Sequence, residues 1–158
     1  MTLLLDSCTL IWLACEPAQL SVAAQAAMDD PASVLHVSHA SRWEITLKHG
    51  AGKLTLPDTP RHWWGEQVRQ WGLVELHLSA KALLRGSELP RDHKNPFDRV
   101  ILAQAQMDGM PVVSPDGDFP AYGIPLLWWE LSGWWSGVRV TLRMWRTDQP
   151  VRESRLAS

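Results

Sequence analysis

The chain has 158 residues, a length that suits one domain with a substantial apolar core. Hydrophobic residues make up 46% of it, charged residues 20%, and the net charge is −2, which excludes a broadly basic nucleic-acid binder although not a local basic groove. No apolar run reaches the roughly 18 residues that span a bilayer, and the first residues lack the basic leader of a signal peptide. We therefore expect a cytoplasmic protein without membrane contact, whose two cysteines, Cys8 and Cys15, are free thiols.

Short apolar runs alternate with helical patterns along the chain. The runs typical of strands are residues 2–6, 33–38, 73–78, 110–114 and 124–129. The segments predicted to be helices are residues 7–15, 22–30, 39–52, 60–71, 79–89 and 96–109. Ser21 and Ser38 are of the type that caps a helix N-terminus, and Pro60 suits a first helical turn. This alternation predicts an α/β fold with a mostly parallel central sheet of about five strands flanked by helices.

The composition changes after Leu127. Residues 128–158 hold five of the ten tryptophans, and five arginines against three acidic residues. Apolar and polar residues alternate from 138 to 143, which is typical of a strand. We expect residues 1–127 to form the domain and residues 128–158 to be a Trp- and Arg-rich extension. The extension could pack back onto the domain, pair with a partner or be disordered beyond about residue 148, and we assign it no function.

Two carboxylates interrupt apolar helical faces. Asp98 lies three and four residues before Ile101 and Leu102, so it shares their face of the helix. Glu44 lies within a second apolar stripe, formed by Ala40, Leu47 and Ala51. Burying an ionised carboxylate without a partner costs several kcal/mol, so each of these two acids should have a nearby group that compensates its charge.

Chain lengths place two further acids at the same edge of the sheet as Asp98. Asp6 ends the first strand, and Asp116 follows the fourth. A helix from 98 to 109 descends about 16 Å at 1.5 Å per residue, and the strand after it climbs back about 15 Å at 3.3 Å per residue. Asp98 and Asp116 therefore return to the carboxyl edge of the strands, where Asp6 also lies and where open α/β sheets bind ligands. Glu44 is expected just below this edge.

Four converging carboxylates cannot all stay ionised without a counter-charge. A divalent cation supplies one, and an all-oxygen ligand set favours Mg²⁺ or Mn²⁺ over zinc. Such an ion can polarise a phosphodiester and activate a water for in-line attack, without a histidine base. The candidate metal ligands and catalytic residues are therefore Asp6, Glu44, Asp98 and Asp116.

Residues around the acids suit a phosphate ligand. Ser7 and Thr9 lie at a helix N-terminus, where backbone N–H groups favour anions, and Ser114 lies two residues before Asp116. Six basic residues could line a groove for a polyanion, namely Arg42, Lys48, Lys53, Arg91, Lys94 and Arg99.

Each of these residues also has a purely structural interpretation. Asp6 could cap the first helix, and Asp116 could be an ordinary turn residue. Glu44 could form a solvated i,i+4 pair with Lys48. Asp98 could interact with the helix dipole or pair with a neighbouring arginine. The remaining basic residues could be solvated surface, so the case for a site depends on four acids sharing one edge.

Four motifs resemble, in this order, segments of PIN-domain proteins: "LLLDSCTLIWL", "VSHASRWEITLKHGAGKLTL", "LPRDHKNPFDRVILAQA" and "VVSPDGDFPAYGIPLL". The chain is most similar to the VapC-like toxin branch of type II toxin–antitoxin systems. The resemblance covers roughly Thr2 to Leu127, and the second and third motifs are the more specific ones. It implies a three-layer PIN-like fold.

The resemblance also implies an activity and partners. Members of this branch are Mg²⁺- or Mn²⁺-dependent ribonucleases, usually homodimeric, that a cognate antitoxin neutralises; operator DNA is bound only through the antitoxin. The acidic quartet of the family falls on Asp6, Glu44, Asp98 and Asp116, and its serine or threonine before the last acid falls on Ser114. The branch commonly has an acid where this chain has Asn95, which makes Asn95 a supporting residue of the site.

We interpret the chain as an endoribonuclease toxin that hydrolyses RNA with a metal-activated water. Two alternatives stay open. One is a catalytically weak PIN-fold module that binds an antitoxin and, together with it, operator DNA. The other is a different metal-dependent phosphoesterase. Trp63 and Trp64, on the predicted helix 60–71, could either seat an antitoxin segment or pack in the core.

Overall fold

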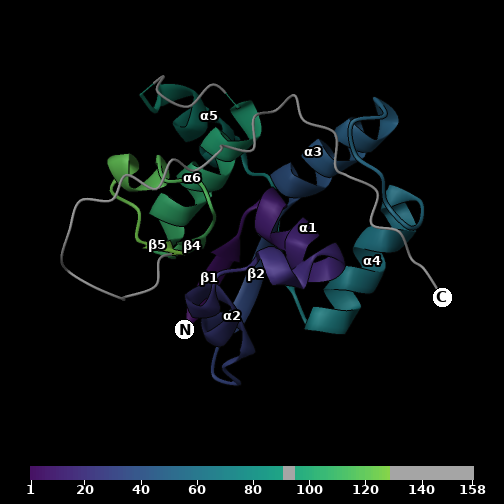
Figure 1. The fold of residues 1–158 in the computed structure, drawn as a ribbon. Helices are drawn as coiled ribbons and strands as arrows, with labels where there is room; N and C mark the ends of the chain where they lie inside the picture. Colours follow the sequence, from purple (N-terminus) through teal and green to yellow (C-terminus); the bar gives the residue numbers. More distant parts are fainter. Residues whose placement is uncertain (91–94, 129–158) are drawn as a thin grey trace.

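A five-stranded parallel sheet forms the centre of the computed structural model, which describes residues 1–90 and 95–128 (Figure 1). The strands are β1 (Thr2–Leu5), β2 (Val34–Ser38), β3 (Val74–Leu76), β4 (Val112–Val113) and β5 (Leu126–Leu127). They lie in the order β3-β2-β1-β4-β5, and each neighbouring pair is parallel. The expected fold class and number of strands are confirmed. Because β1 is central, its carboxyl end lies between those of β2 and β4.

Helices connect these strands. The α-helices of the described residues are α1 (Ser7–Cys15), α2 (Val22–Asp29), α3 (His39–Gly50), α4 (Pro60–Trp71), α5 (Ala80–Glu88) and α6 (Pro96–Asp108). The two expected serine caps form, because Ser21 Oγ accepts from the Ala24 N–H and Ser38 Oγ accepts from the Ala40 N–H. Two short 3₁₀ helices, η1 (Pro17–Gln19) and η2 (Phe119–Tyr122), were not expected, since three or four residues show no periodicity. Within the described part of the chain, none of these helices combines the length and apolarity that a membrane crossing requires.

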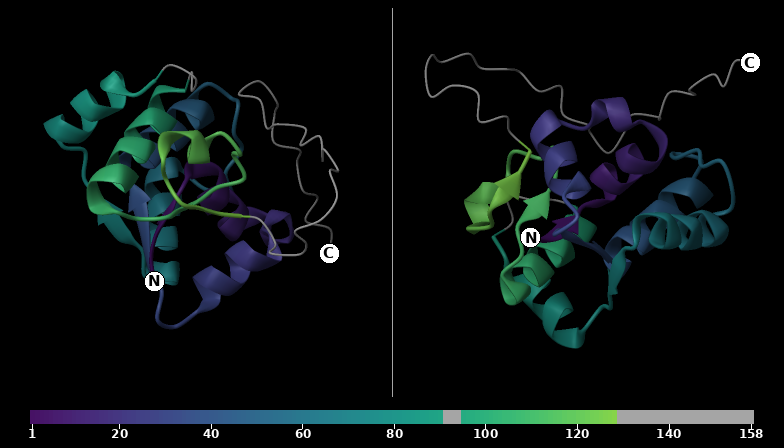
Figure 2. Two further views of the ribbon diagram at one scale, coloured as in Figure 1. Left: turned by 90° about the vertical axis from the view of Figure 1, so that its left-hand side faces the viewer. Right: turned by 90° about the horizontal axis from the view of Figure 1, so that it is seen from below.

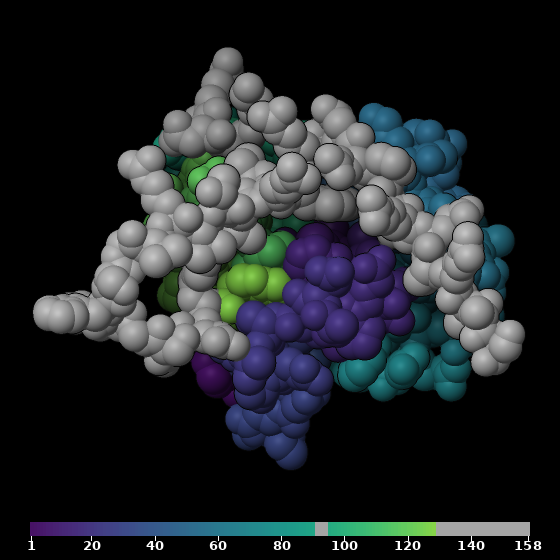
Figure 3. Space-filling view, in the orientation of Figure 1, coloured from purple at the N-terminus to yellow at the C-terminus, as the bar shows by residue number. Residues whose placement is uncertain are grey.

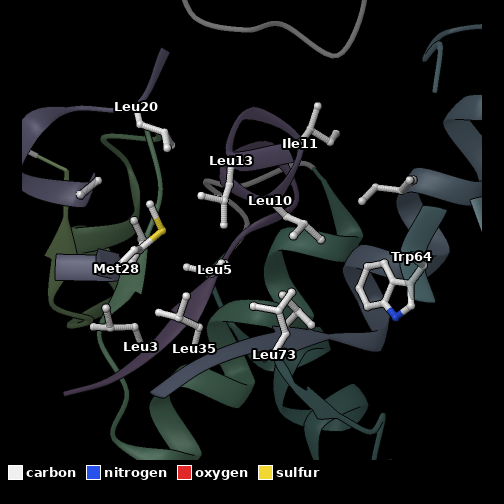
Figure 4. Packing of buried hydrophobic residues seen from close by; sticks show 14 of the residues in the cluster. Leu3, Leu5, Leu10, Ile11, Leu13, Leu20, Met28, Leu35, Trp64 and Leu73 are labelled. Atoms are coloured by element: carbon white, nitrogen blue, oxygen red, sulfur yellow. The ribbon is translucent and has the colours of Figure 1, made fainter. Parts of the chain in front are cut away.

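Alternating side chains of β1 separate two hydrophobic cores. Leu3 and Leu5 pack into the first core with residues of α1, α2 and α4 (Figure 4). Leu4 packs into the second core, where Ile101 and Leu102 of α6 are fully buried. In the views of Figure 2, α1 and α2 cover one face of the sheet and α5 and α6 cover the other. The expected three-layer architecture is therefore confirmed.

Three tryptophans whose roles the sequence left open belong to the core. Trp63 and Trp64 of α4 are 3% and 2% exposed, so they pack inside the domain and cannot seat a partner segment. Trp128, assigned to the extension from the sequence, is also buried, and its ring lies 5.5 Å from that of Trp12 in α1. Figure 3 shows this end of the described chain beside α1. The folded domain thus reaches at least residue 128, and the rest of the predicted extension, 129–158, lies outside the described residues.

The apolar stripe predicted on α3 is correct only in its first half. Ala40 and Glu44 are buried, but Leu47 is half exposed and Ala51, just after the helix, is exposed. The helix instead turns Ser41 and Ile45 toward the interior. The buried face of α3 therefore contains Ala40, Ser41, Glu44 and Ile45, and Leu47 lies outside it.

The contact between α5 and α6 predicts different effects for two glycine substitutions. A Cβ on Gly86 of α5 would lie 3.2 Å from the backbone oxygen of Arg99 in α6, whereas a Cβ on Gly65 of α4 would meet nothing within 4 Å. Both changes to alanine gain about 1 kcal/mol of helix propensity, but only Gly86→Ala forces two backbones apart, at a cost of about 1–3 kcal/mol. We expect Gly86→Ala to be less stable than Gly65→Ala by that amount in urea denaturation. Equal stability of the two variants would mean that α5 and α6 do not approach this closely.

Candidate functional site

Asp6 is held rigidly where β1 ends and α1 begins. Its side chain is 5% exposed and caps α1, because Oδ1 accepts a hydrogen bond from the Thr9 N–H at 2.6 Å. Oδ2 accepts from Ser114 Oγ at 2.5 Å. Burial raises the pKa of Asp6 to about 6; the hydrogen bonds from Ser114 and Thr9 oppose this rise, and the negative charge of Glu44 adds to it. Asp6 is therefore both a helix cap and a perturbed carboxylate near a second acid.

Ser114 connects Asp6 to Asp116. It follows β4, it is fully buried, and its Oγ also accepts the backbone N–H of Asp116 at 3.1 Å. Asp116 is half-buried, and its Oδ1 accepts the backbone N–H of Asp118 at 2.9 Å. This hydroxyl thus bridges the carboxylate of Asp6, which follows β1, and the backbone N–H of Asp116, which follows the neighbouring strand β4.

Glu44 is buried more deeply than any other acidic residue in the described part of the chain. It is 2% exposed, and its Oε1 lies 2.9 Å from Lys48 Nζ and 2.9 Å from Asn95 Nδ2. The i,i+4 pair with Lys48 exists, yet it is not a solvated pair, because the two side chains are only 15% and 3% exposed. The other oxygen, Oε2, is buried and accepts no hydrogen bond from the described residues. Glu44 is therefore clamped through one oxygen and has the second available for a ligand.

Asp98 lies in the first turn of α6, close to the same group of charges. Asn95 caps this helix, since its Oδ1 accepts the Phe97 N–H at 3.1 Å while its Nδ2 reaches Glu44. Asp98 itself is half-buried. Burial is the main cause of the raised pKa of the Cys8 thiol in α1. The negative charges of Asp6, Glu44 and Asp98 raise this pKa further and the positive charge of Lys48 lowers it, so these four charged groups lie near Cys8.

These residues could hold a hard divalent cation. Their donor atoms are carboxylate oxygens, which suit Mg²⁺ or Mn²⁺, and Glu44 Oε2 is a buried oxygen that lacks a hydrogen-bond donor within the described residues. No three His, Cys, Asp or Glu side chains of the described ranges lie close enough together to form a complete metal site. Mg²⁺ commonly keeps several waters and takes only one or two direct carboxylate ligands. Among the described residues, Glu44 Oε2 is therefore the oxygen best suited to serve as a direct ligand of such an ion.

Two residues predicted to contact phosphate are engaged elsewhere. Thr9 Oγ1 donates to the Val113 carbonyl oxygen at 2.7 Å and so fastens α1 to β4. Arg99 donates to the carbonyl oxygens that end α5, those of Ser87, Leu89 and Pro90. The Thr9 hydroxyl and the Arg99 guanidinium thus already have backbone acceptors within the domain, and a role of either residue toward phosphate stays a prediction. Ser7 fits better, since its Oγ is buried at the start of α1 without a hydrogen bond to the described residues.

The basic residues predicted to line a groove differ in their surroundings within the described part of the chain. Lys53 is exposed. Lys48 is buried against Glu44, and Arg42 lies 3.7 Å from Glu75 and stacks over the Trp64 ring at 5.9 Å. Arg91 and Lys94 lie outside the described residues. The positive charges of Lys48 and Arg42 therefore serve to balance buried or half-buried acids.

Two polar networks next to the site were not expected from the sequence. Ser38 Oγ donates to Gln104 Oε1 at 2.6 Å, and Gln104 Nε2 donates to the His77 carbonyl oxygen at 3.1 Å, which ties α6 to the carboxyl ends of β2 and β3. Gln104 is 4% exposed, and its place within the apolar stretch "ILAQA" is the signal that could have revealed it.

The second network surrounds Glu75 of β3. Its Oε2 accepts from Trp64 Nε1 at 2.8 Å and lies 2.9 Å from His39 Nε2. Burial opposes ionisation of Glu75, but the hydrogen bonds from Trp64 and His39 and the charge of Arg42 outweigh it and lower the pKa. A glutamate in a three-residue strand carries no sequence signal for such a role, because its partners come from α3 and α4.

Comparisons with known proteins agree with this fold. No curated protein matches the chain. Solved structures with a similar fold include VapBC2 from Rickettsia felis bound to a DNA fragment from their promoter, with 13% identity and a TM-score of 0.57 over 82% of this chain and 100% of the matched chain. VapBC-1 from nontypeable Haemophilus influenzae has 11% identity and a TM-score of 0.54 over 82% and 98%. FitAcB from Neisseria gonorrhoeae has 18% identity and a TM-score of 0.51 over 79% and 96%. The family model described as PIN domain matches residues 3–125, and the chain therefore belongs to the PIN domain family.

Proposed function

We propose that this chain is a divalent-metal-dependent endoribonuclease and the toxin of a type II toxin–antitoxin module. PIN domains are generally nucleases, and this chain belongs to that family. The observation that carries the proposal is the buried carboxylate of Glu44, which keeps one oxygen without a hydrogen-bond partner among the described residues and raises the pKa of Asp6 through its charge. Such an arrangement is costly for stability and is typical of a site that awaits a cation.

Each residue of the candidate site has a distinct role in the proposed reaction. A bound Mg²⁺ or Mn²⁺ would supply Lewis acidity toward the phosphodiester and lower the pKa of a water molecule. Asp6, Glu44, Asp98 and Asp116 would hold the ion directly or through water. Ser114 and the Thr9 N–H fix the orientation of Asp6, and Lys48 and Asn95 fix that of Glu44. Since the pKa of Asp6 is about 6, its ionised form, which the cation requires, predominates above that pH.

The partners follow from the same proposal. The similar structures include VapBC2, which is bound to a DNA fragment from their promoter. For this chain we propose a cognate antitoxin, an RNA substrate, a homodimer and a cytoplasmic location, with operator DNA contacted only through the antitoxin. A catalytically weak antitoxin-binding module is the second candidate, favoured by the lack of a complete metal site within the described residues.

Cleavage of total RNA tests the proposal. Asp98→Asn is expected to reduce cleavage in Mn²⁺ by at least about 100-fold, which corresponds to about 2.7 kcal/mol of transition-state stabilisation. Asp108→Asn, the same change at the other end of α6, is the matched control and should retain wild-type activity. Chelation of the metal ion with EDTA should abolish RNA cleavage by the wild type and by Asp108→Asn. Parallel assays on single-stranded DNA and nitrophenyl phosphate separate a ribonuclease from another phosphoesterase. Equal cleavage by all three proteins, or no cleavage by the wild type, would contradict the proposal.

A further inference from the structure

An exposed aromatic pair lies where α3 meets α6. Trp43 of α3 is 55% exposed, and its ring lies 5.3 Å from that of Phe97 in α6, at an interplanar angle of 86°. The other tryptophans of the described residues are buried or half-buried. An edge-to-face contact fixes the orientation of the Trp43 ring while more than half of its surface remains open.

Both members of this aromatic pair are next to acidic residues of the candidate site. Trp43 directly precedes Glu44, and Phe97 directly precedes Asp98. The hydrogen bond from Asn95 Nδ2 to Glu44 Oε1 joins the same two helices, and the Phe97 N–H donates to Asn95 Oδ1. The exposed Trp43 ring therefore lies one residue away from a proposed metal ligand, on a helix that Asn95 fastens to the start of α6.

The exposed large apolar residues of α3 are Trp43 and, one turn later, Leu47, which is 50% exposed. One ring of nucleobase size next to a phosphodiester site matches the stacking platforms of proteins that bind single-stranded nucleic acid.

We propose that Trp43, supported edge-on by Phe97, is a stacking platform for one nucleobase of the RNA next to the scissile phosphate. This inference rests on the proposed ribonuclease function and adds a base-binding subsite to it. Because every base has an aromatic face, the platform accepts any base and contributes affinity and register more than sequence preference.

Matched RNA substrates test this subsite. Once a cleavage position has been mapped in a short single-stranded RNA, two further versions carry an abasic nucleotide on the 5′ or the 3′ side of it. For the wild type, one of the abasic versions should lower kcat/KM by about 5- to 150-fold. Trp43→Ala should lose a similar factor on the intact RNA and show little further loss on that abasic version. Trp43→Phe should recover part of the activity, because it keeps an aromatic face.

Two controls make the test decisive. Leu47→Ala, an exposed apolar residue on the same face of α3, should cleave like the wild type, and Mn²⁺ affinity measured by calorimetry should be equal in Trp43→Ala and wild type. The proposal is wrong if Trp43→Ala cleaves intact RNA normally, or if the abasic penalty persists unchanged in that variant. A Trp43→Ala variant that cleaves normally but loses binding to an antitoxin or to a second copy would show a protein contact instead. If the wild type cleaves no RNA, the proposed function fails, and the subsite fails with it.

Discussion

The Asp6→Asn variant is expected to be more stable than the wild type without metal, although it should be inactive. Burial raises the pKa of Asp6 from its ordinary 3.8 to about 6, so the folded protein holds more protons than the unfolded chain between pH 4 and pH 6. The free energy of unfolding therefore falls as the pH rises through this window and is constant above it. Ionised Asp6 therefore lowers the free energy of unfolding by about 3 kcal/mol in total, since each pKa unit corresponds to about 1.4 kcal/mol. Asparagine does not ionise and still accepts the Thr9 N–H, so it should recover up to about this amount above pH 7.

Urea denaturation in EDTA at pH 4.5 and pH 8 measures the effect. The two proteins should differ little at the lower pH, and Asp6→Asn should be the more stable one at the higher pH. Added Mn²⁺ should raise the stability of the wild type by about 2.7 kcal/mol when the ion is present at 100 times its Kd, and that of Asp6→Asn by less. Asp108→Asn serves as the exposed control and should follow the wild type throughout. A variant that loses stability at pH 8 would mean that Asp6 is a structural cap and not a strained ligand.

Lys48→Met is expected to cause a large loss of stability, about 3–5 kcal/mol. Lys48 Nζ lies 2.9 Å from Glu44 Oε1, and both side chains are largely removed from solvent. Removing one partner of a buried ion pair leaves the other charge uncompensated, which is far more costly than removing both. The hydrogen bond from Asn95 can compensate only part of the Glu44 charge.

The double variant Glu44→Gln/Lys48→Met separates this explanation from simple loss of packing. If the penalty comes from the uncompensated buried charge of Glu44, the glutamine should restore most of the lost stability, because it removes the charge and keeps the shape. Urea denaturation of the two single variants and the double variant gives the coupling energy directly. Additive effects, with no recovery in the double variant, would mean that the pair contributes little and that Lys48 acts through its apolar stem.

Local features of the fold were predictable from the sequence. The helices α1 and α4 begin and end where proline, glycine and capping residues indicate, and Ser21 and Ser38 cap α2 and α3 as expected. These signals depend on neighbours within a few residues, which a single sequence contains. Which face of α3 is buried was less predictable. Strands and helices far away in the sequence decide whether the Leu47 side or the Ile45 side packs against the interior.

In the candidate site, too, some positions were predictable from the sequence and the long-range contacts were not. Counting residues along a helix and a strand predicted that Asp98 and Asp116 return to the edge of the sheet where Asp6 lies. In the structure, Ser114 Oγ hydrogen-bonds both the Asp6 carboxylate and the backbone N–H of Asp116. The i,i+4 pair of Glu44 with Lys48 was one of the interpretations of the sequence, but the hydrogen bond from Asn95 to Glu44 was not foreseen, because the two residues are 51 positions apart. Thr9 was assigned to phosphate, yet its hydroxyl binds a carbonyl oxygen 104 residues away. Side-chain partners of this kind depend on tertiary distances that no local pattern encodes.

Calorimetric titration with Mn²⁺ at pH 7.5 tests most directly whether these carboxylates hold a divalent cation. We expect the wild type and Asp108→Asn to bind Mn²⁺ with the same affinity, and Asp6→Asn and Asp98→Asn each to weaken binding by at least about tenfold, or about 1.4 kcal/mol. Equal binding by all four proteins, or no binding by the folded wild type, would contradict a cation site at the carboxyl ends of β1 and β4.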